Sequence, residues 1–208
     1  IKYEILFVND CSTDNSIEII RSMQCNYLDL TVNLGIGGAM QSGYIYAVKN
    51  NFSFTVQVDG DGQHPQSEIK KLLTCMQESK CDVVIGSRYL TKQGFQSTIL
   101  RRIGINFLSH IIKVLCGFRV KDVTSGLRLF NKEATKIAKQ LYPDEYPEPE
   151  SIILFSRNGL KICETPVTMM ERKGGVSSIR HFLTVYYMFK VSLALIFTNF
   201  QFKSTKNE

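Results

Sequence analysis

The first two-thirds of the chain alternate short β-branched apolar runs with longer amphipathic stretches. The apolar runs predict strands at Tyr3–Val8, Leu28–Val32, Phe54–Val58 and Asp82–Gly86. The stretches between them predict helices at Asp14–Met23, Gly38–Lys49 and Pro65–Glu78. Strands that alternate with helices in this way are typical of a mostly parallel sheet flanked by helices. The pattern therefore predicts an α/β fold.

The pattern changes after Arg101. A second amphipathic stretch at Arg101–Leu115 predicts a helix with one apolar face. A strand at Leu127–Phe130 and a helix at Lys132–Gln140 follow it. A proline-rich turn then precedes a helix at Ser151–Arg157 and a strand at Lys161–Met169. We expect these elements to complete the same domain.

The segment Phe182–Phe200 is almost wholly apolar, and Lys190 interrupts it near its centre. Spanning a bilayer takes about 20 apolar residues, so the length is nearly sufficient. A lysine at mid-bilayer costs about 2.5–3.5 kcal/mol, however, which argues against a lone span. We expect an amphipathic helix that lies in the membrane interface, with a buried core helix as the alternative.

Composition narrows the class of protein only in part. The chain has 208 residues, a net charge of +6 and 44% hydrophobic residues, which fits one globular domain. The positive charge suits nucleic acid, an anionic membrane or a phosphorylated substrate, and does not choose among them. The six cysteines form no C-x-x-C pair, so we expect free thiols in a reducing compartment and no zinc site.

The strongest chemical signal is the pair Asp59 and Asp61, which follows the predicted strand Phe54–Val58. Two carboxylates one residue apart can converge on one hard cation. Such a cation can bridge a diphosphate and stabilise the charge that builds as the diphosphate leaves. A calcium loop is excluded because Lys70 stands where that loop needs a glutamate. An ordinary Asp-Gly turn stays open as the alternative.

Three motifs in order resemble family 2 glycosyltransferases: Val8-Asn9-Asp10-Cys11-Ser12-Thr13-Asp14, Asn33-Leu34-Gly35 and Asp59-Gly60-Asp61. Three later motifs resemble the polyprenyl-phosphate sugar synthases of that family: Ile85-Gly86-Ser87-Arg88-Tyr89, Asp122–Leu129 and Arg172-x-x-Gly175-x-Ser177. The likeness runs from about Lys2 to Ser178. It implies the GT-A fold, a nucleotide-sugar donor, Mg²⁺ or Mn²⁺, and a lipid phosphate acceptor.

The resemblance also implies a role for individual residues. At the donor, it places Asp10, Asn33, Gly35, Asp59 and Arg172 in the nucleotide-sugar site. It implies that Asp59, Asp61 and Gln63 bind the metal and the diphosphate. For the acceptor it implies Arg88, Ser125, Arg128 and one of Arg101 or Arg102, of which Arg102 is preferred. The family's first strand, expected ahead of Ile1, is absent from this sequence, so we expect an upstream piece to be missing.

These features together predict an inverting glycosyltransferase. Residues 1–178 would form the GT-A domain and residues 179–208 an apolar helix with a basic tail. The enzyme would sit on the cytoplasmic inner face of the membrane, with a small membrane protein as a further partner and no nucleic acid. A lipid phosphate is already an anion at neutral pH, with a second pKa of about 6, and would need no general base.

Two other functions stay open. The first is transfer to a saccharide hydroxyl in surface polysaccharide synthesis. That reaction needs a base, for which Glu148 and Glu150 are the candidates. The second is a non-catalytic GT-A subunit that binds a membrane partner.

Overall fold

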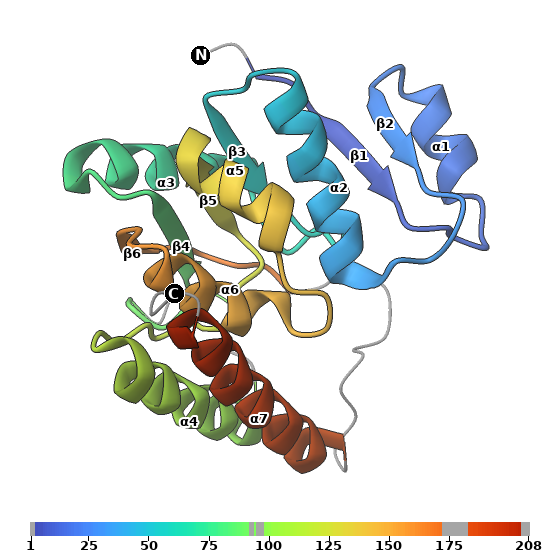
Figure 1. Cartoon of the computed structure of the whole chain (residues 1–208). Helices are drawn as coiled ribbons and strands as arrows, with labels where there is room; N and C mark the ends of the chain where they lie inside the picture. The colour runs from blue at the N-terminus through green and yellow to red at the C-terminus, as the bar shows by residue number, and fades with distance from the viewer. Residues whose placement is uncertain (1–2, 92–93, 95–97, 172–182, 205–208) are drawn as a thin grey trace.

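The structure is a computed structural model and describes residues 3–91, 94, 98–171 and 183–204. The strands of this part are β1 (Leu6–Asn9), β2 (Asn26–Asp29), β3 (Phe54–Gln57), β4 (Val83–Ser87), β5 (Arg128–Asn131) and β6 (Ile162–Pro166). The helices are α1 (Ser16–Ser22), α2 (Gly35–Lys49), α3 (Gln66–Ser79), α4 (Ile99–Cys116), α5 (Lys132–Leu141), α6 (Pro147–Arg157) and α7 (Leu183–Ser204). The α/β fold predicted from the sequence is confirmed (Figure 1).

The strands form two sheets rather than one. β1 and β2 pair in parallel, and a second sheet has the order β3-β5-β4-β6. Within it, β4 and β6 are parallel, while β5 runs antiparallel to both β3 and β4. The expectation of a mostly parallel sheet is confirmed, because β3, β4 and β6 run in the same direction and β5 is the strand that is reversed. Apolar runs in the sequence do not carry strand direction, so the reversal at β5 could not be read from them.

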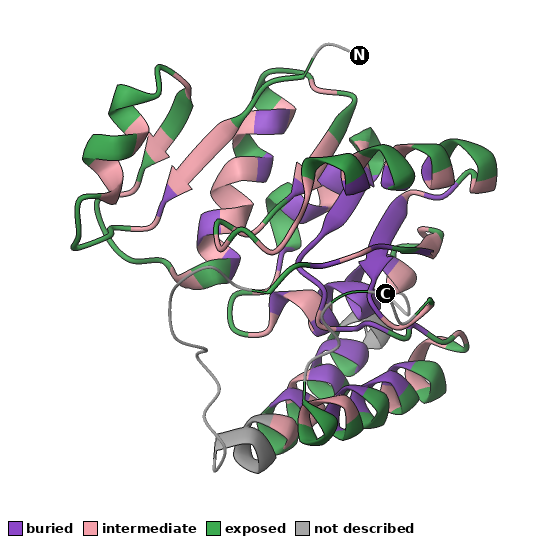
Figure 2. Ribbon diagram, turned by 180° about the vertical axis from the view of Figure 1, so that it is seen from behind, coloured by how far each residue is buried: buried purple, intermediate pink, exposed green. Residues whose placement is uncertain are grey.

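Strand β4 is the centre of the core, and each of its residues is buried (Figure 2). Successive side chains of a strand point to opposite faces of the sheet. Val83 and Ile85 accordingly pack in a cluster with residues of α2, α4, α5, α6 and α7. Val84 packs on the other face with Leu72 and Met76 of α3. The larger sheet thus lies between two layers of helices.

Most predicted elements are present, with shifted ends. β2 begins at Asn26 instead of Leu28, and α2 begins at Gly35 instead of Gly38. Helix α6 begins at Pro147, although the sequence analysis placed the prolines in a turn and started the helix at Ser151. Proline is favoured in the first turn of a helix because its missing N–H has no partner to lose there. The earlier start puts Glu148 inside the helix.

The apolar C-terminal segment forms α7, which packs along α4 and α6 (Figure 1). Its buried face includes Val191 and Leu195, and two polar contacts tie it down. Thr198 donates to Glu150 at 2.8 Å, and Arg157 of α6 donates to Asn199. α7 is therefore attached to the domain and is not a separate segment. Across the described residues, no helix has the length and apolarity needed to cross a membrane.

Cys81 and Cys163 form a disulfide, although the sequence analysis expected free thiols. Cys81 lies just before β4 and Cys163 lies in β6, so the pairing of these strands brings the two residues together. They are 82 residues apart in sequence, and their spacing gave no sign of a pair. The other cysteines are free.

Candidate active site

The carboxylate of Asp59 lies where β3 ends, opposite the segment that leads into β5. The antiparallel register pairs Gln57, the last residue of β3, with Arg128, the first residue of β5. Continued by two residues, the same register brings Asp59, after β3, against Gly126, before β5. A methyl group added to Gly126 would stand 2.7 Å from Oδ1 and 2.8 Å from Cγ of Asp59. Carbon atoms do not approach that closely without displacement, so only glycine leaves room for this carboxylate. The side chain of Asp59 keeps 37% of its surface exposed.

Residues 60–65 form a tight loop after Asp59. The carboxylate of Asp61 accepts a hydrogen bond from the backbone N–H of Gln63 at 3.0 Å, and Gly62 adopts a positive φ of 74°. Gln63 is held in turn by Met170, which donates its backbone N–H to the Gln63 carbonyl at 3.0 Å. The side-chain amide of Gln63 donates in turn to the backbone carbonyl of Met170 at 3.2 Å. The loop is thereby fixed to the segment that follows β6.

These residues fit a divalent cation that is shared with a substrate. Within the described residues, no group of three or more His, Cys, Asp or Glu side chains could enclose a metal by itself. Mg²⁺ is usually bound by one or two carboxylates together with substrate phosphates and water, not by an all-protein cage. Asp59 and Asp61 supply such a partial set, and the absence of a side chain at Gly126 leaves room for the Asp59 carboxylate.

Three of the five residues predicted at the nucleotide sugar lie together between β1 and α2. The Asp10 carboxylate accepts the backbone N–H of Leu34 at 2.7 Å, and Asn33 donates its amide to the Asp10 carbonyl at 3.2 Å. Asn33 also accepts the backbone N–H of Gly35 at 3.1 Å. Gly35 has a φ of 73°, a conformation that favours glycine. Their contact with a nucleotide stays a prediction, and Arg172 lies outside the described residues.

Arg88 forms a buried ion pair with Asp122. Its Nε and Nη2 donate to the two oxygens of Asp122 at 2.7 and 2.6 Å, and Thr124 accepts a further bond at 3.2 Å. Burial opposes the charge, but the hydrogen bonds of Asp122 outweigh it and raise the pKa of Arg88. The Arg88 guanidinium, which was predicted to bind an acceptor phosphate, is thus already bound to the Asp122 carboxylate.

Tyr89 lies between two arginines. The guanidinium carbon of Arg88 is 5.2 Å from the ring centroid, and that of Arg102 is 5.7 Å from it. Both distances suit cation–π attraction. The Tyr89 hydroxyl is buried without a hydrogen-bond partner. Arg102 is half-buried, and no carboxylate of the described residues lies within ion-pairing distance of it. Arg102 is therefore better placed than Arg88 to meet an anionic ligand.

Arg128, which the resemblance implied at the acceptor, is held inside the domain. It is fully buried, and its guanidinium donates to the carbonyls of Ser125 and Val123 and to the hydroxyl of Ser151. These bonds at 2.8–3.1 Å fix the segment that carries Gly126. The side chain has no exposed surface in this structure, and a direct contact of Arg128 with an acceptor stays a prediction. Ser125 is also buried, with its hydroxyl unpartnered.

A buried polar group that the sequence analysis missed lies behind Asp59. Gln57, the last residue of β3, accepts the hydroxyls of Tyr44 and Tyr142 at 2.9 Å each. Burial raises the pKa of Glu148 beside it, while the charge of Arg128 opposes that rise. The negative charge of Asp59 also raises the Glu148 pKa, so the two carboxyls share one site. A buried glutamine at the end of a strand was the signal that could have indicated this group.

The structure separates the two candidate bases. Glu148 faces Gln57 and Asp59, whereas Glu150 accepts a hydrogen bond from Thr198 of α7. Residues two apart in the first turn of a helix point in different directions. Glu150 therefore belongs to the contact between α6 and α7, and Glu148 belongs to the site.

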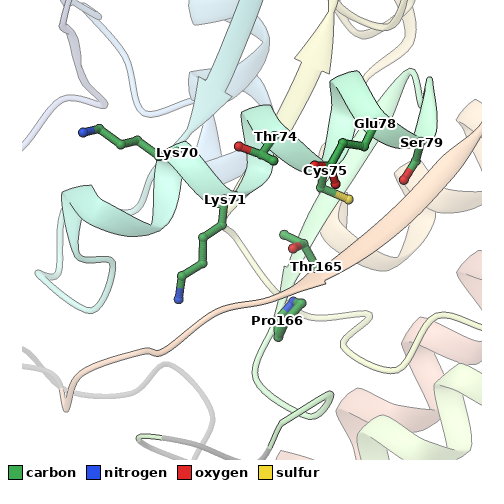
Figure 3. Close-up of a pocket in the computed structure, with 8 residues that line it drawn as sticks. All are labelled: Lys70, Lys71, Thr74, Cys75, Glu78, Ser79, Thr165 and Pro166. Atoms are coloured by element: carbon green, nitrogen blue, oxygen red, sulfur yellow. The ribbon is translucent and has the colours of Figure 1, made fainter.

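A separate groove of about 390 Å³ lies between α3 and β6 (Figure 3). Its lining comes from Lys70, Lys71, Thr74, Cys75, Glu78, Ser79, Thr165 and Pro166. Lys71 is paired with Glu68 at 2.7 Å. None of the predicted site residues lines this groove, so it is distinct from the site around Asp59.

Comparison with known proteins defines the class. A glucosyl-3-phosphoglycerate synthase from Mycobacterium tuberculosis, solved with Mn²⁺, UDP-glucose and phosphoglyceric acid, matches with a TM-score of 0.64 over 93% of this chain and 68% of that one. Sequence identity is 17%, so the match establishes the GT-A fold alone.

Sequence comparison gives the family. The profile of glycosyl transferase family 2 matches residues 1–137. A UDP-N-acetylglucosamine–dolichyl-phosphate N-acetylglucosaminyltransferase of Methanococcus voltae is 30% identical over 78% of this chain and 73% of its own length. A polyprenol monophosphomannose synthase of Mycolicibacterium smegmatis is 27% identical over 90% of this chain and 74% of its own. The chain belongs to glycosyl transferase family 2 and is a glycosyltransferase.

Replacing Gly126 with alanine should displace the Asp59 carboxylate, because the new methyl group has no other space. We expect nucleoside diphosphate binding in the presence of Mn²⁺ to weaken at least about tenfold, by analogy with disturbed metal-site support. Gly60→Ala is the matched control, since a methyl group there meets nothing within 4 Å. Calorimetric titration measures both variants. Equal affinities would show that Gly126 does not constrain Asp59.

Replacing Asp122 with asparagine should leave the Arg88 charge buried and uncompensated. Breaking a buried pair from one side costs about 3–5 kcal/mol, whereas an exposed pair contributes about 1 kcal/mol or less. Glu133→Gln, which breaks the exposed pair with Lys136, is the control. Urea unfolding compares the two variants, and similar losses of stability would contradict a structural role for the Arg88–Asp122 pair.

Proposed function

We propose that this chain transfers a sugar from a nucleoside diphosphate to a polyprenyl phosphate, with inversion at the anomeric carbon. The names of the relatives support the acceptor class, since they include a dolichyl-phosphate and a polyprenol-phosphate sugar transferase. The observation that carries the proposal is the start of α4. There Arg102, a half-buried cation, lies beside Tyr89, and exposed apolar side chains begin on the same turns.

On the donor side, Asp59, Asp61 and Gln63 would hold Mg²⁺ or Mn²⁺ against the diphosphate. The solved relative with Mn²⁺ and UDP-glucose supports this choice of ion. When bound, the ion would supply positive charge for the leaving diphosphate. Asp10, Asn33, Gly35 and Arg172 would contact the nucleotide sugar.

In the transfer step, an oxygen of the acceptor phosphate bonds to the anomeric carbon as the bond to the diphosphate oxygen breaks. The nucleoside diphosphate leaves with the electron pair. No proton has to be removed from the phosphate, because it is already ionised near neutral pH. The task of Arg102, together with Ser125 of the Asp122–Leu129 motif, would be to bind and orient that anion. The Arg88 guanidinium is bound to Asp122, so Arg88 would contribute to acceptor binding by holding the Tyr89 ring in place.

The outer faces of α4 and α7 support docking on a membrane. We call the apolar side chains exposed there the α4/α7 face; it comprises Ile99, Leu100, Ile103, Phe107, Val114, Phe189, Leu193, Ile196, Phe197 and Phe200. An ordinary surface helix turns its apolar side inward, but these two helices carry large apolar residues on both sides. Figure 2 shows exposed positions along the outside of both helices.

We propose an anionic bilayer as the occupant of the α4/α7 face. Neither helix has an acidic residue, while Arg101, Arg102, Lys113 and Lys190 are basic. Such a surface is attracted to anionic headgroups and gains from burial of its phenylalanines. Residues 1–178 would form the catalytic domain and residues 179–208 would complete the membrane-facing layer. The enzyme would work on the inner face of the membrane, although the disulfide gives no support for a reducing compartment.

Transfer to a saccharide hydroxyl is the second candidate, and the position of Glu148 favours it. Burial raises the pKa of Glu148, which makes the carboxylate a stronger base for the acceptor proton. In that reaction the hydroxyl oxygen bonds to the anomeric carbon as the bond to the diphosphate oxygen breaks. Glu148 would take the hydroxyl proton, and the nucleoside diphosphate leaves with the electron pair.

Arg102→Ala should impair transfer to a polyprenyl phosphate more than it impairs hydrolysis of the donor. A charge-assisted hydrogen bond contributes about 1.5–3 kcal/mol, which is about tenfold or more in acceptor use. Purified chain is incubated with a panel of nucleotide sugars and a short polyprenyl phosphate, and radiolabel in the lipid phase is counted. Lys49→Ala, at the exposed end of α2, is the control.

Equal losses of transfer and hydrolysis in Arg102→Ala would assign the residue to the donor or the fold. Labelling of a saccharide in preference to the lipid, with loss in Glu148→Gln, would select the second candidate.

Phe107→Glu on α4 and Phe197→Glu on α7 should each weaken binding to anionic vesicles at least about tenfold, since a buried phenylalanine contributes about 1.5–3 kcal/mol. Both side chains are exposed, so the fold should tolerate the change. Ile19→Glu, an exposed position on α1, is the control. Flotation with phosphatidylglycerol vesicles measures binding. Undiminished flotation of the variants, or binding only to membranes that contain protein, would contradict the lipid proposal.

A further inference from the structure

His64 is a buried side chain that the proposed reaction does not use. Only 4% of its side chain is exposed, and its Nε2 lies 3.4 Å from Oδ2 of Asp59. The other ring nitrogen, Nδ1, is buried and has no hydrogen-bond partner. The loop that carries Asp59 and Asp61 thus turns an imidazole back onto the first of its two carboxylates.

The unpartnered nitrogen indicates which tautomer is present. A neutral imidazole has one N–H donor and one bare acceptor nitrogen. A carboxylate can only accept, so the proton belongs on Nε2, where it faces Asp59. Nδ1, on the far side of the ring, has no hydrogen-bond partner. The ring therefore presents a donor to Asp59 and nothing to its other side.

Gly126 limits the carboxylate from another direction. Both oxygens of Asp59 lie within the space that a methyl group at Gly126 would take, while Oδ2 is also the oxygen near His64. The carboxylate is therefore bounded by a glycine backbone and by an imidazole. A side chain with two free torsions is restricted to one orientation by such contacts, which lowers the entropic cost of binding a cation.

We infer that His64 is a positioning residue that orients the Asp59 carboxylate toward the metal and the donor diphosphate. The inference rests on the proposed function, because it takes Asp59 to be a metal ligand. His64 itself does not contact the ion. Outer-shell partners of this kind hold a ligand in the orientation that the metal needs, and their loss typically weakens metal affinity about 10–100-fold.

The test measures Mn²⁺ affinity by electron paramagnetic resonance in the presence of UDP or GDP, whichever the parent chain binds more tightly. His64→Phe keeps a ring of similar shape but has no donor, and should lose about 10–100-fold in Mn²⁺ affinity. His64→Gln places an amide donor near the position of Nε2 and should keep most of the affinity. His110→Phe, on the exposed surface of α4, is the matched control and should behave as the parent.

Nucleotide binding without metal distinguishes positioning from a general loss of structure. It should stay unchanged in His64→Phe, together with the melting temperature. If His64→Phe does not fold, His64→Asn replaces it, since its amide is too short to reach Asp59. Parental Mn²⁺ affinity in the donor-free variant would overturn the inference. Parental affinity in Asp59→Asn as well would overturn the metal proposal, whereas loss in Asp59→Asn alone would leave that proposal standing.

Discussion

The antiparallel register between β3 and β5 is the constraint on which the site depends. It pairs Gln57 with Arg128 and brings Gly126 against Asp59. A shift of one residue would turn every side chain of the strand to the opposite face of the sheet. Arg128 would then lose its bonds to the carbonyls of Val123 and Ser125, and Asp59 would meet a side chain in place of glycine. The fully buried Arg128 is thus a structural residue that fixes the segment opposite the aspartates.

Acidic groups gather around Asp59, while the cation Arg102 lies beside Tyr89 at the start of α4. The buried Arg88 is neutralised by Asp122, and the raised pKa of Glu148 reflects burial close to Asp59. Arg102 remains available at the start of α4, next to an aromatic ring. Helix α6 connects these regions, because Glu148 lies at its first turn while Glu150 and Arg157 hold α7. The proposed membrane face and the proposed reaction centre are therefore attached to one helix.

Periodicity in the sequence was enough to predict the α/β fold, and the motif at Asp59 and Asp61 indicated the candidate site, whose role as a metal site stays a prediction. The roles of the arginines were not predictable in the same way. The resemblance implied both Arg88 and Arg128 at the acceptor, yet a buried carboxylate holds the first, and backbone carbonyls with Ser151 hold the second. Burial and partner depend on strand register, which a sequence pattern does not carry. For the same reason, the sequence did not predict the buried hydrogen bonds of Gln57 or the Cys81–Cys163 disulfide.

The central claim is that Asp59 and Asp61 hold a divalent cation against the donor diphosphate. A crystal grown with Mn²⁺ and a nucleoside diphosphate, with anomalous scattering recorded at the manganese edge, tests it most directly. The account predicts one strong peak within about 2.0–2.2 Å of an oxygen from each aspartate, with diphosphate oxygens completing the shell. A nucleotide bound with no manganese at these carboxylates, or with the ion held elsewhere, would contradict it.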